Sequence, residues 1–309
     1  MSPPIQIRMG GYSPATTSFS RALKLIGDRL IAEFGDAVDV KYVWNIMDLG
    51  YRAEDILWLV EHGVLTLGYQ SSSYLTDRIP ELGILDLPFL FEENGEARAA
   101  MDGELGKILA RKLKERVNYR VLGYFENGFR HISNRLRPVR TPADLAGMRI
   151  RVLPSKVHVK TFELLGAIPL RMDLTEAIAA IKVGSIDAQE NPFVNTVTYG
   201  VHKFHPFHTL SKHFYLSRPI FLFHSAFDAW PQRLQQAMRE AVTAAVLLQR
   251  ELAGEEEEAA RAAIKAEGGA IIELTAAEYD AFAAVVQPIY TDARQFYPPE
   301  ILKLAPRPI

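Results

Sequence analysis

Residues 141–191 alternate between strand-like and helix-like segments, and this alternation restricts the fold more than any other feature of the sequence. Helices are predicted at 155–166 and 173–184, because each opens with a capping residue and ends at a glycine. Short apolar strands flank them, at 149–153, 168–170 and 186–188. The segment therefore predicts a β-α-β-α-β unit. Such units are typical of mostly parallel sheets with helices on both faces, where ligands bind beyond the carboxyl ends of the strands.

The rest of the chain continues the α/β pattern. Apolar spacing predicts, in order, a strand at 5–9, a helix at 18–34, a strand at 39–44, a short helix at 53–61 and an apolar run at 64–69. A much longer helical pattern covers 228–266, and a helix of that length would be about 50 Å long, enough to lie across two lobes. A capping box at Thr275 starts a final helix, and the proline-rich tail from Pro298 is predicted to be extended.

Size and composition exclude several classes of protein. A chain of 309 residues exceeds one ordinary hydrophobic core, so we expect two lobes with a cleft between them. The net charge of -2 argues against a nucleic-acid partner, and the absence of cysteine excludes disulfides and thiolate chemistry. No apolar run reaches the length of a membrane span. The first residues lack the pattern of a signal peptide, so a cytoplasmic protein and a trimmed exported protein both remain open.

Motifs for catalysis or cofactors are missing from the sequence. The Gly10-Gly11 turn matches no phosphate-binding fingerprint, and neither a nucleophile elbow nor an HExxH helix is present. The only metal-like cluster consists of four spaced histidines, His202, His205, His208 and His213. Their loop-like spacing argues against a metal site and, for all but His213, favours loop or surface histidines, so we expect neither a metal nor another cofactor.

Polar residues at predicted strand ends are the candidates for ligand binding. Arg151 ends a buried strand, and a buried guanidinium needs either a neighbouring Asp or Glu or an anionic ligand. Its planar fork matches a carboxylate bidentately. Arg130 precedes another apolar segment and could supply a second donor, or form a surface or interdomain ion pair. Asn191 precedes Pro192, where it could reach the same crevice or only form a turn.

At these residues the chain resembles the substrate-binding proteins of tripartite ATP-independent periplasmic (TRAP) transporters, in the dicarboxylate-binding-protein family. The resemblance lies in FRHISN from Phe129 with Arg137-Pro138-Val139, and in TPADLAGMRIRVLPS from Thr141. It continues in LLGAIPLRM from Leu164, GSIDAQENP from Gly184, ILDLPFLF from Ile84 and SKHFYL from Ser211. Most of the chain is covered, although the first sixty residues are only loosely similar.

The resemblance implies a two-lobed periplasmic-binding-protein fold with a ligand cleft between the lobes and a long helix shared by both. We expect lobe I at 1–124 and 212–251, and lobe II at 125–211 and 252–309. It also implies a binding protein without enzymatic activity, which captures a small organic acid (a hydroxy, dicarboxylic or sugar acid) and delivers it to the TRAP permease in the membrane. The expected protein is a periplasmic monomer whose signal peptide has been removed.

The resemblance also implies roles for individual residues. Arg151 matches the arginine that clamps the substrate carboxylate, Arg130 and Asn191 match assisting positions, and His213 matches a histidine that often lines the cleft. The loosely similar first lobe adds a further set of ligand-binding candidates: Gln70, Ser71 and Tyr12.

The sequence departs from the family pattern near the ligand. Leu174 stands where an aromatic lid over the ligand is frequent, so we expect Leu174 to cover it instead. Ile178 replaces another frequent aromatic, and Lys182 replaces a glutamine. These departures keep the carboxylate anchor but leave the rest of the substrate open.

Two other functions remain as alternatives. The same fold could serve a ligand sensor that reports to a receptor. An enzyme acting on an organic acid would have only His213 and Glu190 as candidate acid or base, and the sequence offers it no recognisable nucleophile or cofactor motif.

Overall fold

The computed structural model describes residues 3–307, and these residues divide into two compact units. Unit 1 consists of the described part of 1–71, with 109–126 and 217–255, and unit 2 of 72–108, 127–216 and the described part of 256–309. Four elements contain a boundary between the units: α4 (Glu104–Val117), β4 (Tyr119–Asn134), β8 (Phe207–Phe223) and α9 (Gln232–Ala266). The expected lobe I also contained 72–108, but in the structure these residues cluster with unit 2, because η3 and η4 pack on each other and η4 packs against α5.

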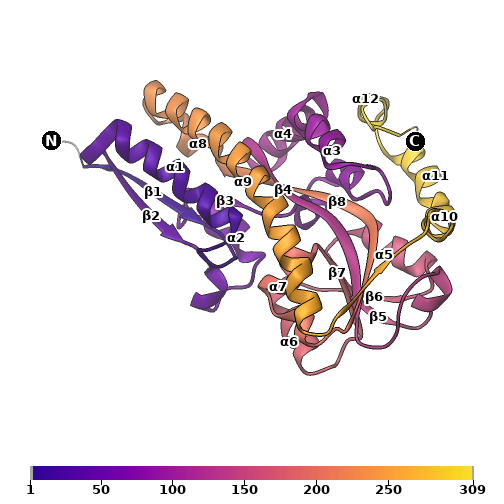
Figure 1. Cartoon of the computed structure of the whole chain (residues 1–309). Coiled ribbons are helices and arrows are strands. Elements are labelled where there is room, and N and C mark those ends of the chain that lie inside the picture. The colour runs from indigo at the N-terminus through magenta and orange to yellow at the C-terminus, as the bar shows by residue number, and fades with distance from the viewer. Residues whose placement is uncertain (1–2, 308–309) are drawn as a thin grey trace. The chain divides into compact units, whose positions relative to one another are not determined.

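Unit 1 contains a sheet in the order β2-β1-β3-β8. Strand β1 pairs in parallel with β2 and β3, whereas β3 and β8 are antiparallel. Helix α1 lies along β1 and β2 (Figure 1). The bounds of these elements are β1 (Ile5–Gly10), α1 (Ser18–Phe34), β2 (Val38–Val43) and β3 (Leu67–Tyr69). Four short helical segments also belong wholly to unit 1: η1 (Gly35–Ala37), η2 (Ile46–Leu49), α2 (Asp55–Glu61) and α8 (His224–Asp228).

Helix α1 follows from local sequence signals. The Thr17 side chain accepts a hydrogen bond from the backbone N–H of Ser20, and Gly35 ends the helix with a positive φ of 51°. Its apolar side chains at helical spacing lie in the core: Phe19, Ala22, Leu23, Ile26 and Leu30. Ile31, at the edge of this face, is 45% exposed.

Unit 2 contains the predicted β-α-β-α-β unit, which is confirmed as β5-α5-β6-α6-β7. The strand order is β8-β4-β7-β5-β6, with β9 on β8. Strand β5 is parallel to β6 and β7, but β4 is antiparallel to β7, so the sheet is mixed. The bounds are β5 (Arg149–Val152), α5 (Lys156–Leu164), β6 (Ile168–Arg171), α6 (Leu174–Lys182), β7 (Ala188–Asn191), α7 (Phe193–Thr198) and β9 (Ala270–Glu273).

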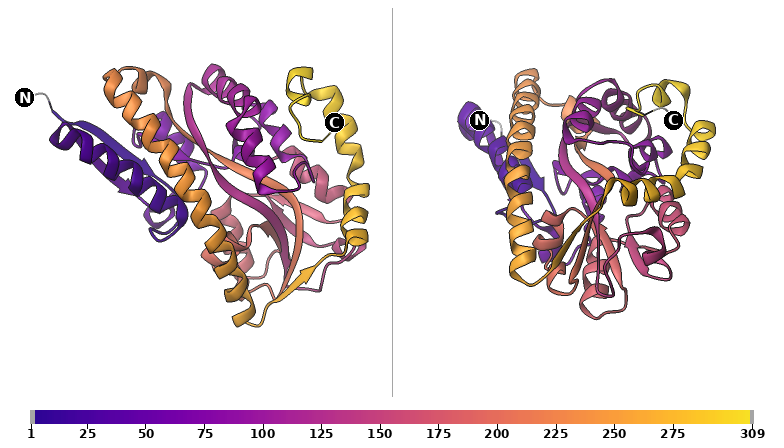
Figure 2. Two further views of the ribbon diagram at one scale, coloured as in Figure 1. Left: turned by 45° about the horizontal axis from the view of Figure 1, so that its top comes forward. Right: turned by 45° about the vertical axis from the view of Figure 1, so that its right-hand side comes forward.

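The remaining elements of unit 2 lie before and after this sheet. Helix α11 packs against α5, and the C-terminal helices follow one another through α12 (Figure 2). The predicted extended tail is wrong, because Pro298 caps a last helical turn and Pro299 occupies its first position, where a missing N–H costs nothing. The bounds are η3 (Ser72–Leu75), η4 (Pro80–Asp86), α3 (Asn94–Asp102), η5 (Pro142–Leu145), η6 (Val201–Lys203), α10 (Ala276–Val285), α11 (Gln287–Phe296) and α12 (Pro299–Leu302).

Candidate ligand-binding site

Arg151 is buried in strand β5 without a carboxylate partner. Its Nε donates to the backbone oxygen of Met172 at 3.1 Å, and its Nη2 donates to the Tyr74 hydroxyl at 3.1 Å. Within residues 3–307 no Asp or Glu forms an ion pair with it, so the alternative of a neighbouring carboxylate is not realised. Both partners are neutral, and they use two of the five N–H donors of a guanidinium. The positive charge therefore stays uncompensated by protein, as a site for an anion requires.

Tyr74 is a second residue at this position, which the sequence analysis missed. Its hydroxyl accepts from Arg151 and also from the backbone N–H of Leu174, at 3.1 Å in each case. Leu174 is the first residue of α6 and is buried, so Tyr74 links the arginine to the start of this helix. Tyr74 lies 77 positions before Arg151 in the sequence, and no local pattern predicts that contact.

Arg130 is buried as well, but Glu190 neutralises it. The Nε of Arg130 donates to Glu190 Oε2 and its Nη2 donates to Oε1 at 2.9 Å, which is a bidentate pair. Burial alone would raise the pKa of Glu190, yet the Arg130 guanidinium and a contact with His213 hold that pKa well below its ordinary value. The ion pair is therefore buried inside unit 2, neither at the surface nor between the units. The Arg130 fork faces Glu190 rather than a ligand carboxylate.

Asn191 ends strand β7 directly after Glu190. It pairs with His131 of β4, and its Oδ1 accepts from Nδ2 of Asn195 at 3.2 Å. Asn195 also donates to Asn127 Oδ1 at 3.1 Å. This amide chain fixes the orientation of Asn191, whose two N–H donors then point away from Asn195. The residue is buried and acts as more than a turn-former.

His213 lies behind Glu190 in strand β8. Its Nδ1 is 2.7 Å from the Ser211 hydroxyl, and its Nε2 is 3.7 Å from Glu190 Oε2. Burial lowers the pKa of His213, and the opposing effect of Glu190 does not restore it. The imidazole is thus neutral near pH 7 and supports the Arg130–Glu190 pair from one side.

His158 also lies near Glu190, although no local sequence pattern singles it out. It is completely buried in α5, with Nδ1 3.9 Å from Glu190 Oε1 and Nε2 3.4 Å from Asp86 Oδ1. Its ring stacks on Phe214 with 4.0 Å between centroids. The apolar spacing of α5 does not distinguish His158 from the other buried positions of this helix. Arg130, Glu190, His213 and His158 form one buried polar cluster in unit 2.

The candidates from the first part of the chain, Tyr12, Gln70 and Ser71, lie in unit 1. Gln70 is buried and donates to the backbone oxygen of Ala53 at 2.8 Å, while its own oxygen accepts from the Ser71 N–H. The Ser71 hydroxyl has no hydrogen-bond partner among residues 3–307. Gln70 therefore shapes the end of β3, and Ser71 offers the free polar atom there.

An arginine–aromatic cluster surrounds Tyr12, and the sequence analysis did not single out its central residue, Arg218. The buried Arg218 guanidinium lies 4.9 Å from the Tyr12 ring centroid and 4.1 Å from that of Phe19. Tyr69 completes the cluster, with its ring 5.3 Å from that of Tyr12. Cation–π contacts of this kind stabilise a buried guanidinium. Arg218 and Tyr12 belong to unit 1, and Arg151 belongs to unit 2.

The described part of the chain contains neither a cluster of metal ligands nor a helix that could cross a membrane. Between residues 3 and 307, no three His, Asp or Glu side chains converge to hold a metal ion. Of the spaced histidines predicted at loops or at the surface, His205 and His208 are instead buried, and His205 bonds to the Ser133 hydroxyl at 2.9 Å. None of the described helices combines the length and the apolarity that crossing a membrane requires.

Comparison with known proteins shows the family. Residues 48–295 match the model of the bacterial extracellular solute-binding proteins, family 7. A solute-binding protein of Verminephrobacter eiseniae is 33% identical over 215 residues, which are 69% of this chain and 64% of that relative. The 2,3-diketo-L-gulonate-binding periplasmic protein of Escherichia coli is 30% identical over 82% of this chain and 76% of its own length.

Solved structures agree with this match. The sugar acid binding protein of Advenella mimigardefordensis, in complex with galactonate, superposes with a TM-score of 0.92 and 26% identity over 98% of this chain and 97% of its own. The family model covers most of the chain, and the motifs around Arg130, Arg151 and Asn191 lie within the matched residues. The chain therefore belongs to family 7 of the bacterial extracellular solute-binding proteins, the TRAP-transporter binding proteins that its motifs resemble.

Proposed function

We propose that this chain binds a small organic acid in the periplasm and delivers it to a TRAP membrane permease. The observation that carries the proposal is Arg151, a buried guanidinium held only by the neutral Met172 carbonyl and the Tyr74 hydroxyl. A charge buried in this way is costly until an anion pairs with it. A ligand carboxylate supplies that anion in the geometry that the arginine fork prefers.

Sugar acids are the first candidates for the ligand. The E. coli relative is named for binding 2,3-diketo-L-gulonate, and the A. mimigardefordensis structure contains galactonate. The fixed Asn191 amide is the kind of group that binds sugar hydroxyls. Asn191 and Arg151 lie on neighbouring parallel strands, β7 and β5.

A thermal-shift screen followed by calorimetry tests the proposal. D-galactonate, 2,3-diketo-L-gulonate and succinate are each added to the protein, with the uncharged sugar galactose as control. Ligand at a hundred times its dissociation constant adds about 2.7 kcal/mol to the free energy of unfolding, which a rise in melting temperature reports. At least one acid should bind and galactose should not. If no carboxylate from a wide panel shifts the melting temperature, the proposal is wrong.

The same samples also test whether the protein only binds the acid or converts it as an enzyme would. A bound acid should be recovered chemically unchanged after long incubation, as mass spectrometry or NMR of the filtrate would show. The pairing of Glu190 supports this expectation, since its carboxylate is held by Arg130 in a bidentate pair and is not available as an acid or a base. Detectable product would favour the enzyme alternative.

A further inference from the structure

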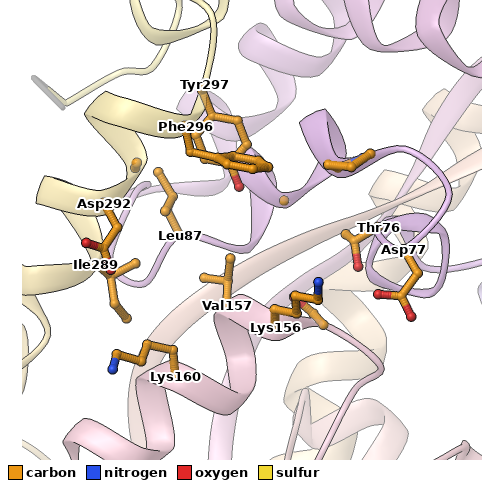
Figure 3. Close-up of a pocket in the computed structure, with 14 residues that line it drawn as sticks. Thr76, Asp77, Leu87, Lys156, Val157, Lys160, Ile289, Asp292, Phe296 and Tyr297 are labelled. Atoms are coloured by element: carbon orange, nitrogen blue, oxygen red, sulfur yellow. The ribbon is translucent and has the colours of Figure 1, made fainter.

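Unit 2 contains a cavity of about 410 Å³ that includes none of the candidate site residues. Its walls come from η4 and the following loop, from α5 and from α11, and the side chains of Leu87, Val157, Ile289 and Tyr297 line its centre (Figure 3). These apolar walls and this volume are typical of sites for small molecules, which range from about 300 to 1,000 Å³.

One end of the cavity offers unpaired hydrogen-bond donors. Ser155 precedes the nine-residue helix α5 and lines the cavity, but its side chain makes no capping bond. Its hydroxyl is completely buried and has no hydrogen-bond partner among residues 3–307. The first intrahelical bond is from the Val159 N–H to the Ser155 oxygen, so the N–H groups before Val159 have no partner in the helix. The start of a helix with free donors favours an anion.

Lysines set the charge at the two ends of the cavity. Lys156 lies beside Thr76 and Asp77 at the Ser155 end, and Asp77 is already paired with Arg171 (Figure 3). Lys160 lies at the opposite end, toward the carboxylate of Asp292 (Figure 3). Neither lysine forms an ion pair within the described residues. The Ser155 end therefore carries a net positive charge, whereas the other end holds one positive and one negative side chain, Lys160 and Asp292.

One large apolar side chain in the wall of the cavity, that of Phe296, is exposed. Phe296 lines the cavity from α11 and is 63% exposed, although it is a large apolar side chain. Ile289 and Ala293 on the same helix, and Tyr297 directly after it, are buried. An apolar molecule in the cavity would cover part of Phe296 and gain roughly 25 cal/mol for each Å² removed from water.

From these observations we propose that the cavity is a second binding site, which takes a monocarboxylate with an apolar body. The carboxylate lies at the first turn of α5, between the Ser155 hydroxyl and the Lys156 ammonium. The apolar body extends past Val157 and Leu87 to Phe296. This inference does not depend on the proposed transport function, because it uses neither Arg151 nor the buried cluster around Glu190.

Calorimetric titration with octanoate tests the proposal, with 1-octanol as a probe of equal length and no charge. Octanoate should bind the wild-type protein at least about tenfold more tightly than octanol, the factor expected for one charge-assisted hydrogen bond. Lys156→Gln and Ser155→Ala should each weaken octanoate binding and leave octanol binding unchanged. Equal affinities for the two probes would contradict the anionic end of the site.

Control variants locate the binding. Lys160→Gln removes the same charge from the same helix, but at the far end, so it should change octanoate affinity much less than Lys156→Gln. Ala293→Phe fills the cavity and should abolish binding of both probes, provided that its melting temperature shows a folded protein. Arg151→Lys should leave octanoate binding intact. Loss of octanoate binding in Arg151→Lys together with retention in Ala293→Phe would overturn the proposal and place the octanoate at the Arg151 site.

Discussion

Arg130 and Arg151 are both buried in unit 2, but their guanidinium groups have different partners. Arg130 is neutralised by Glu190 in a bidentate pair. Within residues 3–307, the hydrogen bonds of the Arg151 guanidinium go only to a backbone oxygen and a tyrosine hydroxyl. Removing Arg130 should destabilise the fold, because it leaves the buried Glu190 carboxylate without a partner. Changing Arg151 should instead weaken ligand binding. The two residues therefore give separable predictions.

Arg151→Lys should weaken binding of the organic acid by a factor of hundreds, because lysine keeps the charge but loses the fork that pairs with a carboxylate. Calorimetric titration with the acid found in the screen measures this. Arg149→Lys is the matched control, since Arg149 is in the same strand and its guanidinium pairs with Asp187 instead. A folded Arg151→Lys protein with wild-type affinity would remove Arg151 from the site.

Arg130→Met should lower the free energy of unfolding by about 3–5 kcal/mol, the usual result of leaving one partner of a buried ion pair without the other. Urea denaturation followed by circular dichroism measures this loss. The double change Arg130→Met with Glu190→Leu should recover much of it, because no buried charge is then left unpaired. If the single variant is as stable as the wild type, the pair does not have the structural role assigned here.

The sequence predicted the burial of Arg151 and its need for a partner, because apolar neighbours in a strand imply burial. It could not predict which arginine would be neutralised internally. The Glu190 partner of Arg130 lies 60 positions away, and the contact depends on the antiparallel register of β4 with β7. Tyr74 and His158 were missed for the same reason. Such contacts follow from tertiary packing, which leaves no local pattern.

At the scale of elements, helix ends were the most predictable features. Apolar spacing placed α1, and the opening residues and terminal glycines placed α5 and α6, close to their observed bounds. The capping box at Thr275 starts α10 as predicted, but α10 is not the final helix, because α11 and α12 follow it. The segment after Thr141 forms a 3₁₀ helix, η5, and the tail after Pro298 is helical rather than extended. A proline can precede either structure, so local sequence does not decide between them.

Gly254 provides a prediction about helix α9, which is 35 residues long. It is exposed, and a Cβ there would meet nothing within 4 Å, so Gly254→Ala should raise the free energy of unfolding by about 0.5–1 kcal/mol. Gly27→Ala in α1 is the control with the opposite sign. A Cβ at Gly27 would come within 1.9 Å of the Tyr42 hydroxyl, a contact that α1 or Tyr42 must relieve by moving. Thermal unfolding of the two variants should shift in opposite directions.

At the scale of the whole molecule, the α/β class and the extent of the family match were predictable, because they depend on repeated patterns over most of the chain. The sequence did not predict that residues 72–108 belong to unit 2. Contacts such as Ser73 to Asp86, at 2.7 Å, and Asp86 to His158 hold η3, η4 and α5 together in unit 2. A Ser or Asp in a connecting segment does not reveal from sequence which unit it will join.

Buried histidines make the stability of the protein depend on pH. Burial lowers the pKa of His205 to about 3 and that of His208 to about 4. The unfolded chain binds these protons near pH 6.5, so the stabilisation is fully present above that pH and is lost as the pH falls below it. Each histidine should contribute up to about 1.4 kcal/mol of lost stability per pH unit between about pH 6 and 4.

Urea denaturation at pH 7, 6 and 5 measures this dependence, and His205→Asn should show a smaller loss over that interval than the wild type. Asp187 does not interfere, because its hydrogen bonds to Arg149 lower its pKa, and its effect on stability is confined to the region below about pH 4. An identical pH slope in His205→Asn would contradict the assignment.

The chain passes between the two units five times, which has a consequence for its synthesis. Strand β3 is complete at Tyr69, but its antiparallel neighbour is formed by residues 220–222 of β8. While the ribosome makes the intervening chain, one edge of β3 has unpaired backbone groups, and open strand edges of this kind recruit other strands. Unit 1 cannot be completed before residue 255 has emerged. The open edge of β3 therefore persists for longer during synthesis than the edge of a strand whose neighbour follows directly in the sequence.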